Sequence, residues 1–152
     1  MFDVIDGLPW HPLVVHAVVV LLPLTVLGTI VIAAVPRWRR PYGPLVLAAA
    51  AVSTALIPVA TSSGESLEKH VGDPGRHAEL GDQLIWFALP LLVLVLLLVV
   101  LDRRGAGRSL LTGVAVLAVV ASLASAVQVY RVGESGARAA WADQVTSSSH
   151  GD

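Results

Sequence analysis

The chain has 152 residues, of which 55% are hydrophobic and only 14% charged, and its mean hydropathy is +0.76. A soluble domain is roughly 45–50% apolar and about 25% charged, so this composition indicates a protein that resides in a membrane. The formal net charge of −1 argues against nucleic acid as an electrostatic partner, and the absence of cysteine excludes disulfides, iron–sulfur clusters and thiolate metal sites.

Four apolar stretches approach or exceed the roughly 20 helical residues that cross about 30 Å of hydrocarbon. They are Pro12–Val35, Gly43–Thr61, Leu84–Leu101 and Leu110–Val132. We therefore expect an all-α fold, a bundle of four transmembrane helices that forms a single integral membrane domain over residues 1–152. The tail at 142–152 is expected to be disordered.

The first predicted helix opens with two histidines on either side of a proline. Pro12 suits the first helical position, because its φ is fixed and its missing N–H is not needed there. His16 then lies roughly 6 Å deeper, where an ionisable side chain normally faces the bundle or a water-filled cavity. His11 and His16 are five residues apart and lie on different faces of the helix. A site in this region therefore needs a ligand from another helix.

Small and hydroxyl residues gather in the second and fourth spans, namely Ala48–Ala51, Ser53 and Thr54, and Ala118, Ala121, Ser122, Ala124 and Ser125. Lipid supplies no hydrophobic drive for helix association, so small residues that allow close backbone approach are the usual contact faces. We expect these two helices at the centre of the bundle. The third span carries a nearly continuous apolar run over residues 91–101 and is expected to face lipid more.

The segment before the third span is typical of a helix start, with Asp73 as N-cap and Pro74 at the first helical position. The third helix would then cover residues 74–101. His77 and Leu84 share one face of that helix, which would bring the His77 imidazole over the mouth of the bundle beside His16. This convergence of His16 and His77 is the central expectation from the sequence.

The alternative is that the histidines are structural. In that case they cap helix ends, pair with Glu65, Glu79 or Glu134, and hold the outer segments in place.

The two short connections, Pro36–Tyr42 and Asp102–Ser109, carry six of the ten basic residues. These are Arg37, Arg39, Arg40, Arg103, Arg104 and Arg108. By the positive-inside rule, both connections face the cytoplasm, which puts the two termini and the segment from 62 to 82 outside.

The second and fourth spans echo each other. Ser53–Ser66 aligns with Ser122–Ser135, and both stretches end in the triplet Gly-Glu-Ser after an outward-running helix. A duplicated two-helix hairpin would give a parallel repeat about an axis along the membrane normal. The glycine triplets would then mark turns at the outer face, with Glu65 and Glu134 converging there.

Three strings together resemble the bacterial membrane family catalogued as domain of unknown function 2231. They are His11-Pro12-Leu13-Val14-Val15-His16, Arg76-His77-Ala78-Glu79-Leu80-Gly81 and Gly133-Glu134-Ser135-Gly136. The resemblance covers almost the whole chain and implies a bacterial plasma-membrane location and the importance of His11, His16, His77, Gly133 and Gly136. Similar domains are found joined to cytochrome or Rieske-type redox modules.

This sequence departs from the family pattern in two places. Ala17-Val18 follows His16 where an aromatic residue and a proline are usual, and Glu134 stands where many relatives have histidine. The second change removes one nitrogen ligand, although a carboxylate also ligates hard or borderline metals.

Three functions are compatible with these features. The first is a redox-associated module that binds haem b or a divalent metal through His16 and His77, with His11 and Glu134 as further metal ligands. The second is a non-catalytic scaffold or assembly subunit whose outer face docks a redox protein or another membrane subunit. The third is a small transporter that uses His16 as a titrating group. The sequence carries no recognisable catalytic motif.

Overall fold

A computed structural model describes residues 4–5, 8–9, 11–71 and 75–148, with side chains for 11–66 and 75–138. The elements in chain order are β1 (Val4–Ile5), β2 (Leu8–Pro9), α1 (His11–Ala34), the 3-10 turn η1 (Pro36–Trp38), α2 (Arg39–Val71), α3 (Arg76–Gln83), α4 (Ile85–Arg103) and α5 (Arg108–Ser148). The two short strands pair antiparallel outside the bundle. The expected all-α bundle is confirmed, because four helical stretches are long and apolar enough to cross a membrane.

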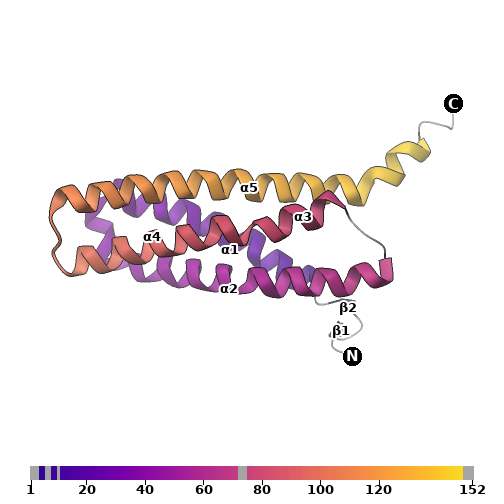
Figure 1. Ribbon diagram of the computed structural model, residues 1–152, viewed down its shortest axis with the longest axis horizontal. Helices are drawn as coiled ribbons and strands as arrows, with labels where there is room; N and C mark the ends of the chain where they lie inside the picture. Colours follow the sequence, from indigo (N-terminus) through magenta and orange to yellow (C-terminus); the bar gives the residue numbers. More distant parts are fainter. Residues whose placement is uncertain (1–3, 6–7, 10, 72–74, 149–152) are drawn as a thin grey trace.

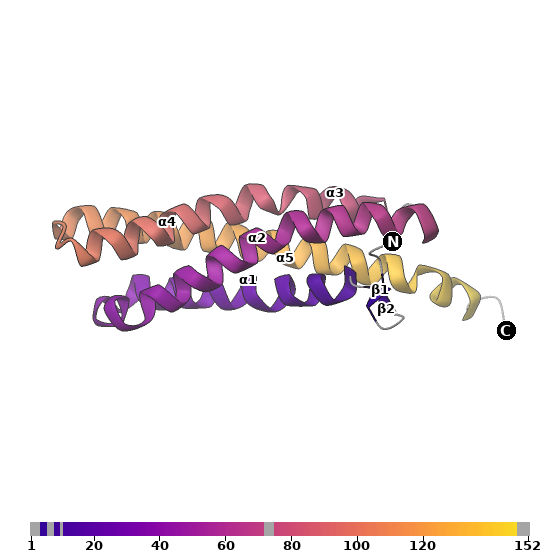
Figure 2. The same cartoon turned by 90° about the horizontal axis from the view of Figure 1, so that it is seen from below.

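Each long helix packs against two neighbours, in the order α1, α2, α4 and α5 around the bundle (Figures 1 and 2). Helix α3 precedes α4 and extends it toward the chain's histidine-bearing end, with a turn at Leu84 between them. The Leu84 N–H donates to the Gly81 carbonyl. The end where α1 begins and α5 finishes carries His11 and His77, and we name it the histidine end. The opposite end carries the six arginines of the two short connections, and we name it the arginine end.

Two expectations about the packing were wrong. The second and fourth spans were expected at the centre and the third facing lipid, yet the shares of buried residues in an apolar 18-residue stretch of each span are 33% for the first and third and 28% for the other two. In a ring of four helices each has two neighbours, so each buries one face to a similar extent. Large apolar residues do not mark a lipid face, because lipid accepts them and so does the core. Leu91, Val95 and Leu98 of α4 are nearly inaccessible.

Helices α2 and α5 run further than expected at the histidine end. The glycine triplets do not form turns, since α2 continues through Gly64 to Val71 and α5 continues through Gly133 and Gly136 to Ser148. Residues 142–148, expected to be disordered, are therefore helical, and residues 149–152 lie outside the described part. A helical glycine costs about 1 kcal/mol relative to alanine, and the alanines that follow position 136 favour continuation. Asp73 and Pro74, expected at the start of the third helix, also lie outside the described residues.

The buried positions support a duplicated hairpin. In α1 they include Val18, Leu22, Thr25, Thr29 and Ile32, and 66 residues later Leu84, Ala88, Leu91, Val95 and Leu98 are buried. In α2 they include Gly43, Val46, Ala50 and Ser53, and 72 residues later Ala115, Ala118, Ser122 and Ser125 are buried. The hairpin of α1 and α2 therefore corresponds to that of α3, α4 and α5. The structural offset of 72 is about one helical turn longer than the pairing of Ser53 with Ser122 suggested.

Candidate functional site

His11, the first residue of α1, is held against α2. Its Nδ1 lies 3.1 Å from the Ala60 carbonyl oxygen and 2.8 Å from Ser63 Oγ. The Ser63 hydroxyl donates to the same carbonyl at 2.9 Å. The ring lies directly over Gly64, where a Cβ would come within 3.2 Å of the imidazole Cε1. The ring is thus held by the Ala60 carbonyl, Ser63 and Gly64, which belong to one helical turn. We call such a set of a carbonyl, a serine and a glycine a histidine seat.

His77 occupies an equivalent seat on α5. Its Nδ1 lies 3.1 Å from the Val132 carbonyl oxygen and 3.3 Å from Ser135 Oγ, and Ser135 donates to that carbonyl at 2.8 Å. A Cβ at Gly136 would come within 2.9 Å of the imidazole Cε1, closer than such contacts occur. The carbonyl, serine and glycine again stand at positions i, i+3 and i+4 of the helix. Gly64 of the first triplet and Gly136, which follows the second triplet, therefore each make room for a histidine within a continuous helix.

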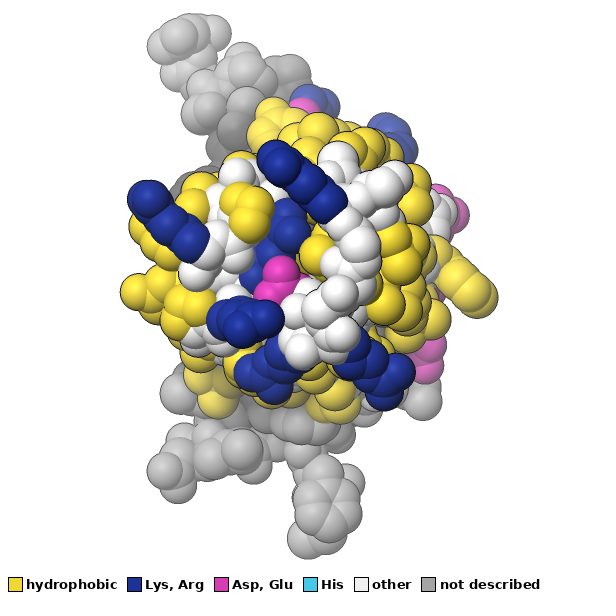
Figure 3. Space-filling model, turned by 90° about the vertical axis from the view of Figure 1, so that its left-hand side faces the viewer, with side chains coloured by type: hydrophobic (Ala, Val, Ile, Leu, Met, Phe, Trp, Pro, Cys, Tyr) yellow, Lys and Arg dark blue, Asp and Glu magenta, His cyan; other side chains and the backbone are white. Residues whose placement is uncertain are grey.

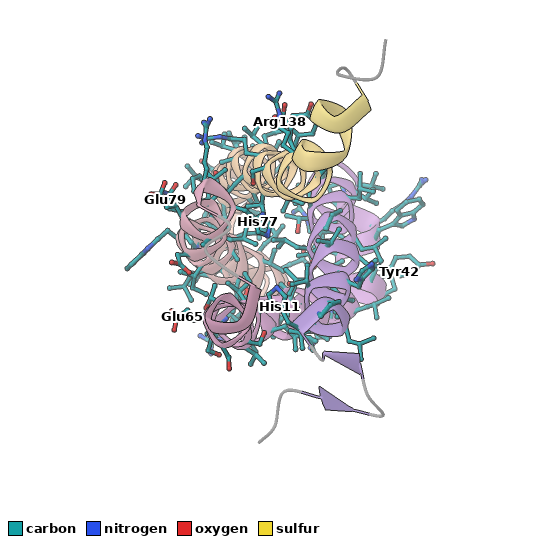
Figure 4. All side chains as sticks on the ribbon, turned by 90° about the vertical axis from the view of Figure 1, so that its right-hand side faces the viewer. His11, Tyr42, Glu65, His77, Glu79 and Arg138 are labelled. Carbon is teal, nitrogen blue, oxygen red and sulfur yellow. The ribbon has the colours of Figure 1, made fainter. Side chains whose placement is uncertain are left out.

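The two seats fix the chemistry of the rings. A carbonyl oxygen only accepts hydrogen bonds, so we assign the ring proton of each histidine to Nδ1 and leave Nε2 with a free lone pair. Among residues 11–66 and 75–138, neither Nε2 has a hydrogen-bond partner. Both imidazoles lie on the inner side of the ring of helices (Figure 4). Two nitrogen lone pairs are therefore brought to one mouth of the bundle.

His16 does not lie beside His77 as the sequence led us to expect. Its side chain is exposed, and its Nδ1 contacts the Pro12 carbonyl of its own helix at 2.6 Å. Five residues advance a helix by about 140° beyond a full turn, so once His11 faces inward His16 must face away. His16 was expected to face the bundle because it lies deeper in the helix, but the angular position around the helix places His11 on the inner face. The usable signal was the spacing of seven residues that separates both His11 from buried Val18 and His77 from buried Leu84.

The acidic residues of this end lie apart from the imidazoles. Glu134, expected as a further metal ligand, is exposed and pairs with Arg138 one turn later at 2.6 Å. Glu65 and Glu79 are exposed at the rim (Figure 4). Across the described side chains no histidine pairs with a carboxylate, and no group of three or more histidine or acidic residues could hold a metal. His70 and His150 lie outside the residues whose side chains are described.

Below the histidines, the buried hydroxyls are satisfied by backbone. Thr25, Thr29, Ser53, Ser122 and Ser125 each donate to a carbonyl about one turn earlier in the same helix. Gln128 donates to the Leu80 carbonyl at 3.0 Å, which ties α5 to α3. In the part of the chain with described side chains, no buried polar side-chain atom lacks a partner. Each of these side chains is therefore already bonded to a backbone carbonyl.

The arginine end contains a clamp. Arg39 is only 6% exposed, and it donates through Nε to the Ile32 carbonyl and through Nη2 to the Ala33 carbonyl, both at 2.9 Å. These carbonyls belong to the last turn of α1, which has no helical N–H to bond them. Asp102, at the end of α4, lies 3.9 Å from Arg39 and 3.6 Å from Arg40. Figure 3 shows this end as basic side chains around an acidic one.

Comparisons with known proteins agree with the architecture. The chain matches no curated protein and no solved structure. A family model described as a predicted membrane protein of domain of unknown function 2231 matches residues 7–149. That match includes both histidine seats and all four candidate spans. The chain therefore belongs to the DUF2231 family of predicted membrane proteins.

Proposed function

We propose that the histidine end is a metal site in which His11 Nε2 and His77 Nε2 bind one ion of the copper or zinc class. The observation that carries the proposal is the pair of backbone carbonyls that hold the Nδ1 sides of both rings. Metal-ligating histidines almost always donate their other ring N–H to a carbonyl, a carboxylate or water, which fixes the tautomer and orients the lone pair. The donor set fits such an ion, because neutral imidazole suits copper, zinc, iron and nickel.

Two protein ligands leave coordination positions for water or for a substrate. Open positions are characteristic of reactive metal centres, whereas structural zinc sites fill all four positions with protein ligands. The same two nitrogens are also the number that a haem b with two axial histidines requires. A redox-associated role follows if the group is copper or haem, whereas zinc has no redox chemistry and would act as a Lewis acid. The visible absorption spectrum of the purified protein tells the two apart, because only haem gives an intense Soret band.

The test is metal binding by protein purified in mild detergent and stripped with a chelator. We expect calorimetric titration with Cu²⁺ or Zn²⁺ to give one ion per chain, and His11→Ala and His77→Ala each to weaken binding by at least about tenfold. His16→Ala is the matched control, since it removes an exposed histidine from the same helix as His11. Equal binding by all four proteins would overturn the proposal, as would a loss confined to His16→Ala.

A second candidate function is the docking of a partner at the histidine end, favoured by the length of two helices. Helix α5 continues for twelve residues beyond Gly136, where the His77 ring packs, which is about 18 Å of helix. Helix α2 likewise continues for seven residues beyond Gly64, where the His11 ring packs. These projections offer a surface to a redox protein or another membrane subunit. If neither His11→Ala nor His77→Ala changes metal content, while removal of residues 139–152 dissociates a co-purifying subunit, docking is the better account.

We also propose that the arginine end faces the cytoplasm of a bacterial cell and the histidine end faces outward. The support is the gathering of six of the ten basic residues at one end of the bundle (Figure 3). Arginine-rich short connections remain on the cytoplasmic side of membrane proteins. A reporter enzyme that functions only in the periplasm should be active when it is fused after Asp152. Activity of a cytoplasm-specific reporter at that position would reverse the orientation.

A further inference from the structure

A groove of about 810 Å³ lies between α1 and α5 at the arginine end. Its walls are apolar, with Ile30 and Ala33 on one side and Leu111, Ala115 and Val119 on the other. Its polar lining includes Arg39, Asp102 and Arg108, which stand where the helices meet the two short connections. The groove is therefore apolar along its length and charged at one end.

The length of the groove matches one leaflet of a bilayer. Its lining on α5 runs from Arg108 to Val120, which is about 18 Å of helix. Half of a hydrocarbon core about 30 Å thick is about 15 Å. Val116 and Val120 are 57% and 59% exposed, so the groove opens sideways onto the surface that faces lipid. An acyl chain of the leaflet on the arginine side can enter it from the membrane.

The equivalent interface between the two hairpins, on the other side of the bundle, is packed tightly. Where α2 meets α4, a Cβ at Gly43 would come within 2.9 Å of Val99 Cγ2, so valine fills the space above the glycine. By the offsets of 66 and 72, the positions equivalent to Val99 and Gly43 are Ala33 and Ala115. Both of these line the groove. Val99 fills the space between α2 and α4, whereas the smaller side chain of Ala33 leaves the equivalent space between α1 and α5 open.

The charge at the mouth of the groove favours an anion. Asp102 lies between Arg39 and Arg40, and two Arg39 nitrogens bond the carbonyls of α1. Arg108 is exposed, and among the described residues it has no ion-pair partner. The acidic group of the mouth is thus already neutralised, and a free guanidinium remains beside the groove. Guanidinium groups pair well with phosphate oxygens.

We propose that this groove binds one anionic phospholipid, with an acyl chain between α1 and α5 and the phosphate at Arg108. Basic pockets between transmembrane helices are recognised sites for anionic lipid head groups. The proposal is independent of the metal site, which lies at the opposite end of the bundle. A lipid accounts for both features of the groove, whereas a free anion would use only its charged mouth.

The test measures lipid retention by native mass spectrometry, with phosphatidylglycerol and phosphatidylcholine of identical acyl chains added in equal amounts. We expect one tightly retained phosphatidylglycerol per chain, and retention about fivefold lower in Arg108→Gln, as for the loss of one basic residue near a membrane surface. Arg104→Gln, which removes an exposed arginine outside the lining, should change retention little. Ala34→Phe should also lower retention, because this exposed alanine lines the groove.

Ala48→Phe is the control for bulk, since it enlarges an exposed alanine on α2 outside the groove. Equal retention of the two lipids would contradict the proposal. So would equal losses in Arg104→Gln and Arg108→Gln, which indicate a diffuse surface charge. Displacement by inorganic phosphate, combined with unchanged retention in Ala34→Phe, would show that the site takes a free anion instead of a lipid.

Discussion

At both ends of the bundle, side chains donate hydrogen bonds to backbone carbonyls, but only at one end do these side chains keep an atom that can bind a ligand. At the arginine end, the Arg39 guanidinium bonds the free carbonyls at the end of α1 and faces Asp102, so most of its donors are consumed within the protein. At the histidine end, His11 and His77 also bond backbone carbonyls, but the second nitrogen of each ring has no partner among the described side chains. A side chain with several donors therefore closes one end, while an imidazole with one donor and one lone pair leaves the other end able to bind a ligand.

The largest effect is expected from Arg39→Ala. It leaves two carbonyls of α1 without donors and removes the nearest buried cation from Asp102, whose side chain is 15% exposed. Loss of one partner of a buried ion pair costs about 3–5 kcal/mol of folding free energy. Thermal or denaturant unfolding in detergent measures this loss.

Arg40→Ala is its control, because Arg40 approaches the same carboxylate but its side chain is 73% exposed. Exposed ion pairs contribute about 0–1 kcal/mol, so this variant should unfold almost as the wild type does. Similar destabilisation by both substitutions would show that the buried hydrogen bonds of Arg39 add nothing to the attraction between surface charges.

The next effect tests the glycine seats. Gly136→Ala puts a methyl group 2.9 Å from the His77 ring, which must leave its seat, and we expect metal affinity to fall about 10–100-fold. Gly133→Ala, in the same helix, meets nothing within 4 Å and should stabilise α5 by up to about 1 kcal/mol. Metal titration should therefore show lower affinity in Gly136→Ala, and unfolding in detergent should show higher stability in Gly133→Ala. Unchanged metal affinity in Gly136→Ala would mean that the seat does not orient His77.

A smaller effect is expected from the serines. Ser63→Ala and Ser135→Ala each remove one partner of a ring Nδ1 but leave the carbonyl, so each should cost about 1 kcal/mol and weaken metal binding severalfold. The two losses should be similar, because the hairpins place the serines in equivalent positions. Ser62→Ala is the control, as its exposed hydroxyl bonds only carbonyls of its own helix. If Ser62→Ala weakens metal binding as much, the serines have no specific role.

The sequence was sufficient for the number of spans and for the all-α fold, because unpaired backbone groups are too costly in hydrocarbon for most other structures. It was insufficient for the faces of the helices. In a soluble helix polar residues mark the outside, but α1 is apolar nearly all round, and only buried Thr25 and Thr29 reveal its inner face. The expectation that His16 would lie beside His77 was wrong for this reason.

The helix ends were misjudged for a related reason. Glycine usually signals a helix end, and the triplets that begin at Gly64 and Gly133 were read in that way. Both glycines instead lie within a helix, and Gly64 and Gly136 provide space for an imidazole that arrives from another helix. This use of glycine depends on a partner 53 or 59 residues away in the chain, which local patterns do not contain. The pairing of His11 with His77 required the three-dimensional equivalence of the two hairpins.

Electron paramagnetic resonance of the Cu²⁺-loaded protein tests the pairing of His11 with His77 most directly, because the spectrum resolves the nitrogen nuclei bound to copper. The account predicts two imidazole nitrogens in the wild type and in His16→Ala, and one in His11→Ala and in His77→Ala. A spectrum that keeps both nitrogens in His11→Ala or His77→Ala, or that loses one in His16→Ala, would contradict it.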